Sequence, residues 1–443
     1  MDSAGIYPAK TRRKSAINRR EYLWSGAVAT AIAADFRALP LARAVHVQGT
    51  DVIKIGLVGC GGRGTGAAVD ALRADPHTKL VALGDIFPDK LQASLKNLQT
   101  LFGNRVDVPE ERAFLGFEAY RHVIECSDVV LLALPTFFHP HYLKAAVEAG
   151  KHVFCEKIHA VDAPGVRMVL EAAELARKKG LSVVSGLAWR YDTGVQETMK
   201  RVHDGAIGQI VAIEEICNTG SLRAVPRRAE WTEMEYQLRD WYNFFWLACD
   251  LPGLNMVHNL DKAAWAMHDE PPLRCWGMGG RQSRVGPQYG DAWDHFAAVF
   301  EYADGVKLFA YCRQQDGTAT EIADRFYGTE RRCNLLQNRI LGKVNWQYQG
   351  PPCNRFLQEQ AALLQSIRTG KPINNGLYMA RSSMMAIMMT WAGYTGQVIT
   401  WQEAMASNRV IAPERLALDA DPPTKPDPSG NYPMPTPGIT RFE

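Results

Sequence analysis

Residues 52–64 read VIKIGLVGCGGRG, and this stretch decides the fold. The apolar run over 52–58 predicts a buried strand, and the segment 66–74 predicts a helix that follows it closely. Between them, residues 59–64 fit the spacing GxGxxG. In such a turn the first glycine permits a tight bend, the second lets a pyrophosphate approach the backbone, and the third lets helix and strand pack closely. The stretch therefore predicts a dinucleotide-binding strand–turn–helix unit.

A carboxylate follows at the position that such a unit needs. Asp85 ends the next apolar run, 21 residues after Gly64, where it can accept hydrogen bonds from the adenosine ribose hydroxyls. The same carboxylate would repel a 2′-phosphate, so we expect NAD as the cofactor and NADP less. The helix N-terminus offers free N–H groups to the phosphates. The turn residues expected to contact the cofactor are Gly59, Gly61, Gly62, Arg63 and Gly64.

The order of apolar runs and helical segments along the sequence predicts two domains. Up to Ser185, short apolar runs alternate with longer helical segments, which is typical of a parallel sheet covered on both faces. After Gly186, runs of β-type composition follow one another without intervening helices, which predicts a mostly antiparallel, open-faced sheet in an α+β domain. These runs are 210–217, 273–277, 295–302 and 306–312.

The C-terminal part completes the second domain. Two helical segments, 355–369 and 379–394, are expected to pack on its sheet, and the last 22 residues contain seven prolines, which predicts an extended arm. The expected organisation is a signal segment, a Rossmann domain, a substrate and oligomerisation domain, and a C-terminal segment with a proline-rich tail. Their bounds are 1–44, 45–186, 187–400 and 401–443.

The N-terminal segment is more positively charged than the rest of the chain. Residues 1–44 hold a net charge of +5, whereas the remainder of the chain sums to −2. Arg19-Arg20 precedes Glu21-Tyr22-Leu23 and a short Ala-rich apolar stretch, a pattern that resembles a twin-arginine export signal with cleavage after Ala44. The alternative is a basic tail followed by an Ala-rich helix. The signal predicts contact with an export machinery and a periplasmic or other extracytoplasmic location, reached after folding and cofactor loading in the cytoplasm.

Composition excludes several other classes. No run approaches the 20 apolar residues of a spanning helix, so we expect no stable membrane anchor, and the weakly acidic remainder gives no sign of a nucleic-acid partner. The nine cysteines form no CxxC pair and are expected to be buried free thiols. His139 and His141 form a pair without a third nearby ligand, so no metal site is expected.

An ordered set of further motifs resembles the Gfo/Idh/MocA oxidoreductase family, which includes glucose–fructose oxidoreductase and inositol dehydrogenase. The motifs cover nearly the whole chain beyond the signal, and the likeness is greatest to exported bacterial members with twin-arginine signals. They are PTFFH (135–139), CEK (155–157), GLAWRY (186–191), HNLDK (258–262), GGRQ (279–282), DHF (294–296) and WAGYTG (391–396).

The resemblance implies a Rossmann domain, an open-faced sheet and a sugar or polyol bound between them. It implies Lys157 as the acid/base residue beside the nicotinamide and His258 as the second catalytic residue, facing the substrate. The further cofactor contacts expected are Thr136, His139, Glu156 and Arg190.

This chain departs from the family pattern at two positions. Ile158 stands where the family has proline after the lysine, and Leu254 stands where members usually carry Asp or Glu, four residues before the histidine. Asp250 and Asp261 are the nearest carboxylates that could replace the missing one.

Physical chemistry alone also suggests roles for Lys157 and His258. A lysine beside a positively charged nicotinamide ring should have a lowered pKa, which makes it a usable base for alcohol oxidation. On a helix, His258 shares one face with Asp261 and Trp265, so Asp261 could orient the histidine; a solvated polar face is the alternative.

Two clusters of aromatic and hydrogen-bonding residues, 190–191 and 239–242, suit the apolar faces and hydroxyl edges of a sugar. They suit a subunit interface equally well, because Arg, Trp and Tyr gather at interfaces too. The residues expected to bind substrate are Tyr191, Arg239, Trp241, Asp261 and His258.

Three functions are open at this point. The first is hydride transfer between tightly bound NAD and a small carbohydrate, in a homo-oligomer, a dimer or tetramer. The second is redox-neutral glycoside cleavage by oxidation, elimination and reduction. The third is a non-catalytic NAD- or sugar-binding protein.

Overall fold

The computed structural model describes residues 51–222 and 224–442. The predicted signal over 1–44 lies outside these residues. The chain divides into the units Met1–Ala42 and Arg43–Glu443, and all the described residues belong to the second.

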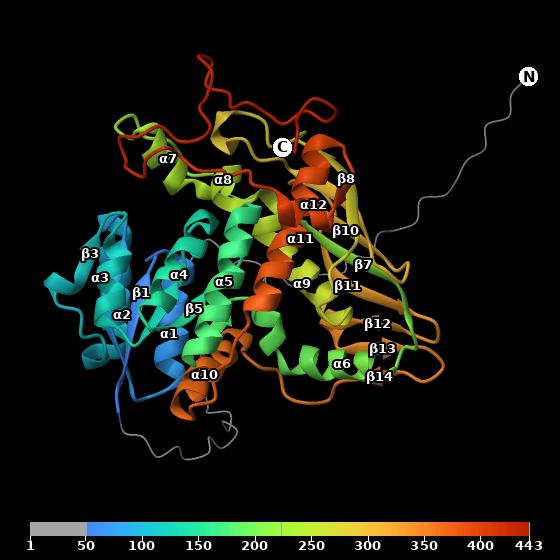
Figure 1. The fold of residues 1–443 in the computed structure, drawn as a ribbon, viewed down its shortest axis with the longest axis horizontal. Helices are drawn as coiled ribbons and strands as arrows, with labels where there is room; N and C mark the ends of the chain where they lie inside the picture. Colours follow the sequence, from blue (N-terminus) through green and yellow to red (C-terminus); the bar gives the residue numbers. More distant parts are fainter. Residues whose placement is uncertain (1–50, 223, 443) are drawn as a thin grey trace, which may run out of the picture. The chain divides into compact units, whose positions relative to one another are not determined.

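A six-stranded sheet forms the N-terminal domain, and every pair of neighbouring strands in it is parallel (Figure 1). The strand order β3-β2-β1-β4-β5-β6 reverses direction between β1 and β4, which is where open α/β sheets bind their ligands. The strands are β1 (Ile53–Val58), β2 (Thr78–Asp85), β3 (Ala113–Leu115), β4 (Val129–Leu132), β5 (His152–Cys155) and β6 (Val183–Ser185).

Helices cover both faces of this sheet because its strands are apolar on both sides. Leu57 and Leu131 belong to a core with the helices α1, α2 and α10, whereas Val58 and Leu132 belong to a core with α3, α4 and α5. The helices are α1 (Gly62–Ala74), α2 (Pro88–Phe102), α3 (Ala119–Cys126), α4 (His139–Glu148) and α5 (Ala163–Lys179). The parallel, doubly covered sheet predicted from the sequence is therefore confirmed.

The second domain is built on a nine-stranded sheet in which β7 and β10 run parallel and the other neighbouring pairs run antiparallel. Helices α6, α9 and α11 lie in this domain, and α9 and α11 pack on the sheet. On the other side Met278 is 72% exposed and Tyr311 38% exposed, so this side is open, as predicted. The larger strands are β7 (Ile210–Thr219), β8 (Arg274–Gly280), β9 (His295–Glu301), β10 (Lys307–Gln314) and β11 (Glu321–Gly328). The short strands are β12 (Arg332–Asn334), β13 (Arg339–Leu341), β14 (Trp346–Gln347) and β15 (Ile399–Thr400).

The expectation that these strands follow without intervening helices is wrong. Between β7 and β8 lie two short helices, a π-helical turn and α9, and α6 precedes β7. The short helices have seven and four residues, too few to show a period in sequence. The helices of this domain are α6 (Thr193–His203), α7 (Glu233–Arg239), α8 (Phe245–Ala248), α9 (Val257–Ala266), α11 (Gly376–Thr395) and α12 (Trp401–Ala406).

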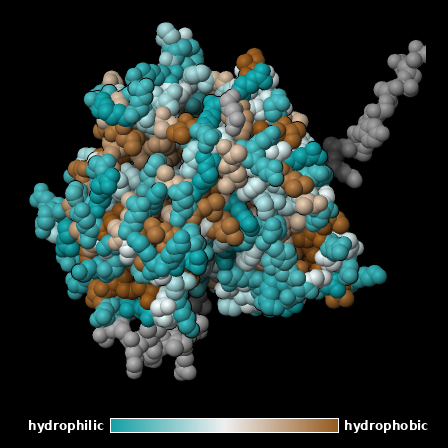
Figure 2. Space-filling view, in the orientation of Figure 1, coloured by the Kyte–Doolittle hydropathy of each residue, from teal (hydrophilic) through white to brown (hydrophobic). Residues whose placement is uncertain are grey.

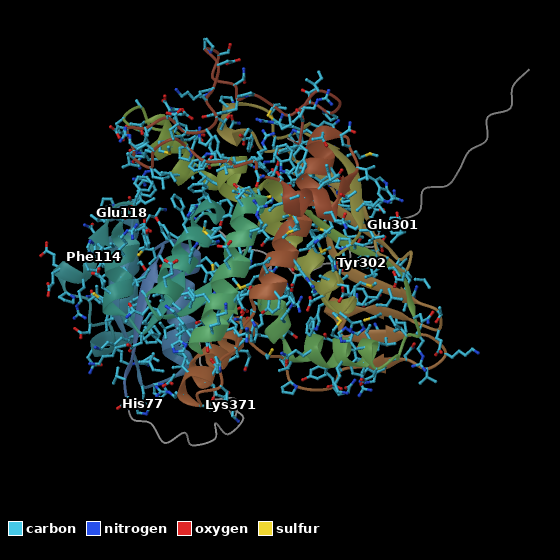
Figure 3. The ribbon with its side chains drawn as sticks, in the orientation of Figure 1. His77, Phe114, Glu118, Glu301, Tyr302 and Lys371 are labelled. Carbon is cyan, nitrogen blue, oxygen red and sulfur yellow. The ribbon has the colours of Figure 1, made fainter. Side chains whose placement is uncertain are left out.

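One later helix returns to the N-terminal domain. α10 (Arg355–Arg368) was expected on the second sheet, but it packs against α1, and its Leu363 and Leu364 are buried in the core with β1 and β2. Arg368 forms an ion pair with Asp75 and donates to the carbonyl oxygen of His77. Figure 3 accordingly shows His77 and Lys371 near each other at the lower end of this domain. The Rossmann domain is thus completed by residues far along the chain.

Residues 407–442, called the C-terminal arm below, contain no helix or strand, as the prolines predicted. The arm is drawn red in Figure 1, where it crosses above α7 and α8. It is anchored by backbone and side-chain hydrogen bonds, such as Gly438 N–H to the Thr395 carbonyl oxygen at 2.9 Å.

The face seen in Figure 2 is mainly hydrophilic, with hydrophobic side chains in separate patches. Within the described residues, no helix is both long and apolar enough to cross a membrane.

Candidate active site and cofactor-binding turn

Two glycines of the turn after β1 are required by close contacts. Gly59 has a φ of +93°, and a Cβ there would lie 2.2 Å from the carbonyl oxygen of Ala133. A Cβ at Gly64 would lie 1.8 Å from the carbonyl oxygen of Gly59. Both positions therefore exclude any side chain, and they close the turn between strand and helix as the sequence pattern predicted.

The other two glycines leave open space instead. A Cβ at Gly61 or Gly62 would meet no atom within 4 Å. The first N–H groups of any helix lack an intrahelical partner, and no side chain of the described residues caps those at the start of α1. An open backbone at a helix N-terminus fits the pyrophosphate of a dinucleotide.

Asp85 lies at the carboxyl end of β2, beside this turn. Its Oδ2 accepts a hydrogen bond from the N–H of Cys60 at 2.6 Å, and its Oδ1 accepts from the N–H of Phe87 at 2.8 Å. Burial raises the pKa of Asp85, while the backbone donors act in the opposite direction. The carboxylate thus joins the glycine turn to the loop after β2, where the ribose contact was predicted.

An ion pair connects the glycine turn to the CEK motif. Arg63 Nε lies 2.5 Å from Glu156 Oε1, and a Cβ at Gly186 would lie 2.6 Å from Glu156 Oε2. On the other side of the arginine, Glu359 of α10 lies 3.6 Å from its Nη2. Burial raises the pKa of Glu359, and the charge of Glu156 adds to this rise. The structure therefore brings together Arg63 and Glu156, two of the predicted cofactor contacts.

The two predicted cofactor contacts at the start of α4 are both buried. Thr136 is 1% exposed. His139 Nδ1 lies 2.6 Å from the carbonyl oxygen of Ile158, and its Nε2 lies 3.3 Å from the N–H of Leu134. Burial lowers the pKa of His139 to about 4. Both ring nitrogens of His139 are thus engaged by backbone groups, and its predicted contact with the cofactor stays a prediction.

Lys157 follows β5 and reaches the second domain. Its ammonium group donates a hydrogen bond to the backbone carbonyl oxygen of Leu254. Burial lowers the pKa of Lys157, whereas the charge of Glu156 raises it. Leu254 lies in the π-helical turn Pro252–Met256, in which the hydrogen-bond pattern differs from that of an α-helix. The position that usually supplies a carboxylate thus supplies a carbonyl oxygen through its backbone.

His258 lies in the first turn of α9, four residues after Leu254. Its Nδ1 has no hydrogen-bond partner among the described residues. Burial lowers the pKa of His258 well below its usual value, and the positive charges of Lys157 and Lys262 lower it further. His258 therefore offers a buried, unpartnered ring nitrogen in the first turn of α9.

Neither proposed substitute carboxylate takes part in this arrangement. Asp250 accepts hydrogen bonds from the N–H of Trp293 at 2.9 Å and the hydroxyl of Tyr394 at 2.5 Å. Asp261 accepts from Arg190 Nη2 at 2.9 Å and from Ser382 Oγ at 2.8 Å. The prediction that Asp261 orients His258 is wrong, because its side chain is 1% exposed and bound to Arg190. A substrate contact at Asp261 stays a prediction.

Arg190 and Tyr191 belong to this same interior cluster. Arg190 also pairs with Asp269 at 2.5 Å, and its guanidinium carbon lies 4.0 Å from the ring centre of Tyr378. The hydroxyl of Tyr191 donates to Asn375 Oδ1 at 2.8 Å. Arg190 thus belongs to an ion-pair network, and Tyr191 packs against the core that includes α10. Their predicted contacts with cofactor and substrate stay predictions.

The second cluster expected to bind sugar, residues 239–242, has two parts with different contacts. Arg239 lies against Phe87 and pairs with Asp89 of α2 at 3.2 Å, and its predicted contact with substrate stays a prediction. Trp241 stacks on Tyr242 with ring centres 4.0 Å apart. Burial and the charge of Glu156 raise the pKa of Tyr242. A substrate contact at Trp241 stays a prediction.

Sequence reasoning missed a buried polar group beneath the site. Lys262 Nζ lies 2.9 Å from Asp324 Oδ1, and Asn259 Nδ2 bridges Asp324 and Glu215 at 2.9 and 3.1 Å. Glu215 and Asp324 are directly paired across β7 and β11. The HNLDK motif contained the signal, since Asn259 and Lys262 lie one turn of helix apart on α9.

One open hollow among the described residues lies away from these side chains. Its volume is about 480 Å³, and it is lined by the end of β8 and by C-terminal arm residues that include Tyr432 and Met434. No group of three or more His, Cys, Asp or Glu side chains in the described part of the chain could hold a metal ion.

Known proteins resemble the chain chiefly over its first domain. Residues 53–187 match the Gfo/Idh/MocA family described as "Oxidoreductase family, NAD-binding Rossmann fold". The chain is 28% identical over 167 residues to glycosyl hydrolase family 109 protein 1 of Bacteroides fragilis, which covers 37% of this chain and 34% of that protein. It is 33% identical over 165 residues to inositol 2-dehydrogenase 4 of Saccharopolyspora erythraea, covering 35% and 43%. The chain thus spans less than half the length of these relatives.

The likeness in fold extends further. Scyllo-inositol dehydrogenase from Lactobacillus casei, solved with NAD(H) and scyllo-inositol, superposes with a TM-score of 0.59 at 19% identity, covering 79% of this chain and 99% of that one. The parallel sheet followed by a mostly antiparallel sheet is therefore an arrangement shared with solved dehydrogenases.

Proposed function

With a Gfo/Idh/MocA-type NAD-binding Rossmann domain as its N-terminal domain, we propose that the protein is an NAD-dependent oxidoreductase acting on a carbon–hydroxyl group of a sugar, polyol or glycoside. One observation carries the proposal. The amine of Lys157, whose pKa is lowered by burial, lies at the carboxyl end of β5, next to Glu156, which is paired with Arg63 of the glycine turn. The names of the relatives, an inositol dehydrogenase and a glycosyl hydrolase, support the substrate class.

The turn and its neighbours would hold the cofactor. The open backbone at Gly61 and Gly62 would receive the pyrophosphate, and Asp85 would accept hydrogen bonds from the adenosine ribose. Arg63 and Glu156 would lie towards the nicotinamide. The carboxylate favours NAD over NADP because it would repel a 2′-phosphate.

Oxidation of a secondary alcohol removes a proton from oxygen and two electrons with a hydrogen from carbon. NAD⁺, when bound, supplies the hydride acceptor. In its neutral form Lys157 accepts the hydroxyl proton, and the Leu254 carbonyl oxygen holds the amine in place through one of its N–H groups. We assign to His258 a hydrogen bond with a substrate hydroxyl, because its Nδ1 lacks a partner among the described residues.

Redox-neutral glycoside cleavage is the second candidate, and the matched glycosyl hydrolase family 109 protein favours it. Oxidation at C3 would acidify the C2 proton, and its removal would expel the aglycone from C1 and leave a C1=C2 double bond next to the ketone. Water would then add across this bond, with its oxygen at C1 and a proton at C2, and return of the hydride to C3 would restore the starting oxidation state. Lys157 serves as the base in both candidates.

The two candidates differ in their products. The full chain is incubated with sugars and with nitrophenyl glycosides, while the nicotinamide absorbance and the released nitrophenol are recorded. Net reduction of NAD⁺ by a free sugar or polyol supports the first candidate. Release of nitrophenol without net reduction supports the second. If neither occurs although NAD is bound, the protein is the non-catalytic binder.

Export would constrain either reaction. If the twin-arginine signal acts, the folded protein leaves the cytoplasm with its cofactor bound, and we include a periplasmic location and a homo-oligomeric state in the proposal. N-terminal sequencing of the exported protein tests cleavage after Ala44.

A further inference from the structure

The side chain of Arg239, at the end of α7 in the second domain, contacts residues that follow β2 in the N-terminal domain. Its guanidinium group lies 3.2 Å from Asp89 Oδ1, and Glu235 holds its Nε at 2.9 Å. The guanidinium carbon lies 3.9 Å from the ring centre of Phe87 and 4.9 Å from that of Trp231. The arginine is therefore enclosed between two rings and two carboxylates, with its side chain 14% exposed.

Arg239 contacts Phe87 and Asp89, which directly follow β2 and lie next to the expected adenosine site. Asp85 accepts the N–H of Phe87 and the N–H of Cys60, so its carboxylate lies between Phe87 and the glycine turn. In a dinucleotide fold the adenosine ribose contacts this carboxylate. Phe87 and Asp89 follow within four residues of it.

The C-terminal arm in turn holds α7, which carries Arg239. Thr232 Oγ1 donates to the carbonyl oxygen of Leu418 at 2.5 Å, and Gln237 Nε2 donates to that of Thr424 at 2.8 Å. The hydroxyl of Tyr432 donates to Glu233 Oε1 at 2.5 Å. Figure 1 shows the arm running beside α7. The contacts form one connected series from the arm, through α7, to Phe87 and the first turn of α2.

We infer that Arg239 is a cofactor-retaining residue: held by α7 and the C-terminal arm, it fixes Phe87 and the first turn of α2 over the adenosine end of the bound dinucleotide and slows its release. The inference rests on the proposed function for the identity of the cofactor. It assigns to the second domain a role on the adenosine side of the cofactor, far along the nucleotide from the amine of Lys157.

The test measures release of the cofactor from the full chain. Protein loaded with NADH is mixed with excess NAD⁺, and the loss of bound-NADH fluorescence gives the dissociation rate. We expect Arg239→Met and Asp89→Asn each to raise this rate about three- to fivefold, the upper part of the range expected for loss of a partly exposed ion pair. Asp89 is 58% exposed, so Asp89→Asn retains the fold even if Arg239→Met does not.

Arg325→Met is the matched control. Arg325 also pairs with two carboxylates, Glu214 and Glu321, but on strands β7 and β11. Its replacement should leave the dissociation rate unchanged. Dissociation rates for Arg239→Met and Asp89→Asn within twofold of the unsubstituted rate would overturn the inference and leave the proposed function standing. Failure of the unsubstituted protein to bind NADH would overturn both.

Discussion

The ammonium group of Lys157 donates a hydrogen bond to the backbone carbonyl oxygen of Leu254, across the boundary between the two sheets. A carbonyl oxygen fixes the position of the amine without adding a negative charge beside it. Because an opposite charge would raise the pKa of the lysine, the neutral acceptor keeps the amine easier to deprotonate. The leucine at a usually acidic position is thereby compatible with a base at Lys157.

Removal of the amine should abolish turnover and spare cofactor binding. Lys157→Ala is expected to lower kcat by about 100-fold or more, since positioned acid–base groups contribute that much. Lys151→Ala is the matched control, because Lys151 also donates to a backbone carbonyl oxygen, that of Ser127 at 2.7 Å, but at the opposite end of β5. Turnover and NADH binding are measured on the same preparations. Full activity in Lys157→Ala would exclude this lysine as the base.

A carboxylate at position 254 should shift the pH profile upwards. In Leu254→Asp the new negative charge raises the pKa of Lys157, so the neutral amine appears only at higher pH. We expect the rising limb of kcat/KM for oxidation to move up by about one pH unit. Leu254→Asn offers similar polarity without charge and should leave the limb in place. Equal profiles for the Asp and Asn variants would contradict the assignment.

Buried His139 should make the folded state less stable in acid. Its folded pKa of about 4 lies below the unfolded value near 6.5, so between these values the unfolded chain binds a proton that the folded chain does not. Its contribution to stability is present above about pH 6.5 and is lost as the pH falls towards 4, at about 1.4 kcal/mol per pH unit. Urea unfolding of the unsubstituted protein and of His139→Gln at pH 7 and pH 5 measures it. The difference between their free energies of unfolding should shrink at pH 5. Asp250, whose pKa is raised to about 6, is common to both proteins and cancels.

Two glycines of the turn should respond in opposite ways to alanine. Gly61→Ala meets no protein atom, so we expect little change in melting temperature but weaker NADH binding, because the methyl group occupies the approach of the pyrophosphate. Gly64→Ala collides with the Gly59 carbonyl oxygen and should lower the melting temperature by several degrees or prevent folding. Thermal melts and NADH titrations of both variants provide the comparison. Unchanged NADH affinity in Gly61→Ala would argue against a pyrophosphate at this turn.

The sequence predicted those parts of the fold whose pattern is local. The glycine turn, the apolar strands around it and Asp85 were found because each depends on neighbours a few residues away. The partners of Asp261 and Arg239 were not, since Arg190 and Asp89 are distant in sequence and only the packed chain brings them together. Leu254 shows a further limit, because its backbone oxygen acts where its side chain predicts nothing.

The return of α10 to α1 sets an order of events during synthesis. Leu363 and Leu364 fill the core beneath β1 and β2, and Glu359 stands beside Arg63 of the nucleotide turn. During synthesis, about three hundred residues must therefore follow the glycine turn before α10 can complete the core of the first domain. Nascent chains shorter than this lack the helix that carries Glu359, so the residues around the nucleotide turn are complete only after α10 has been synthesised.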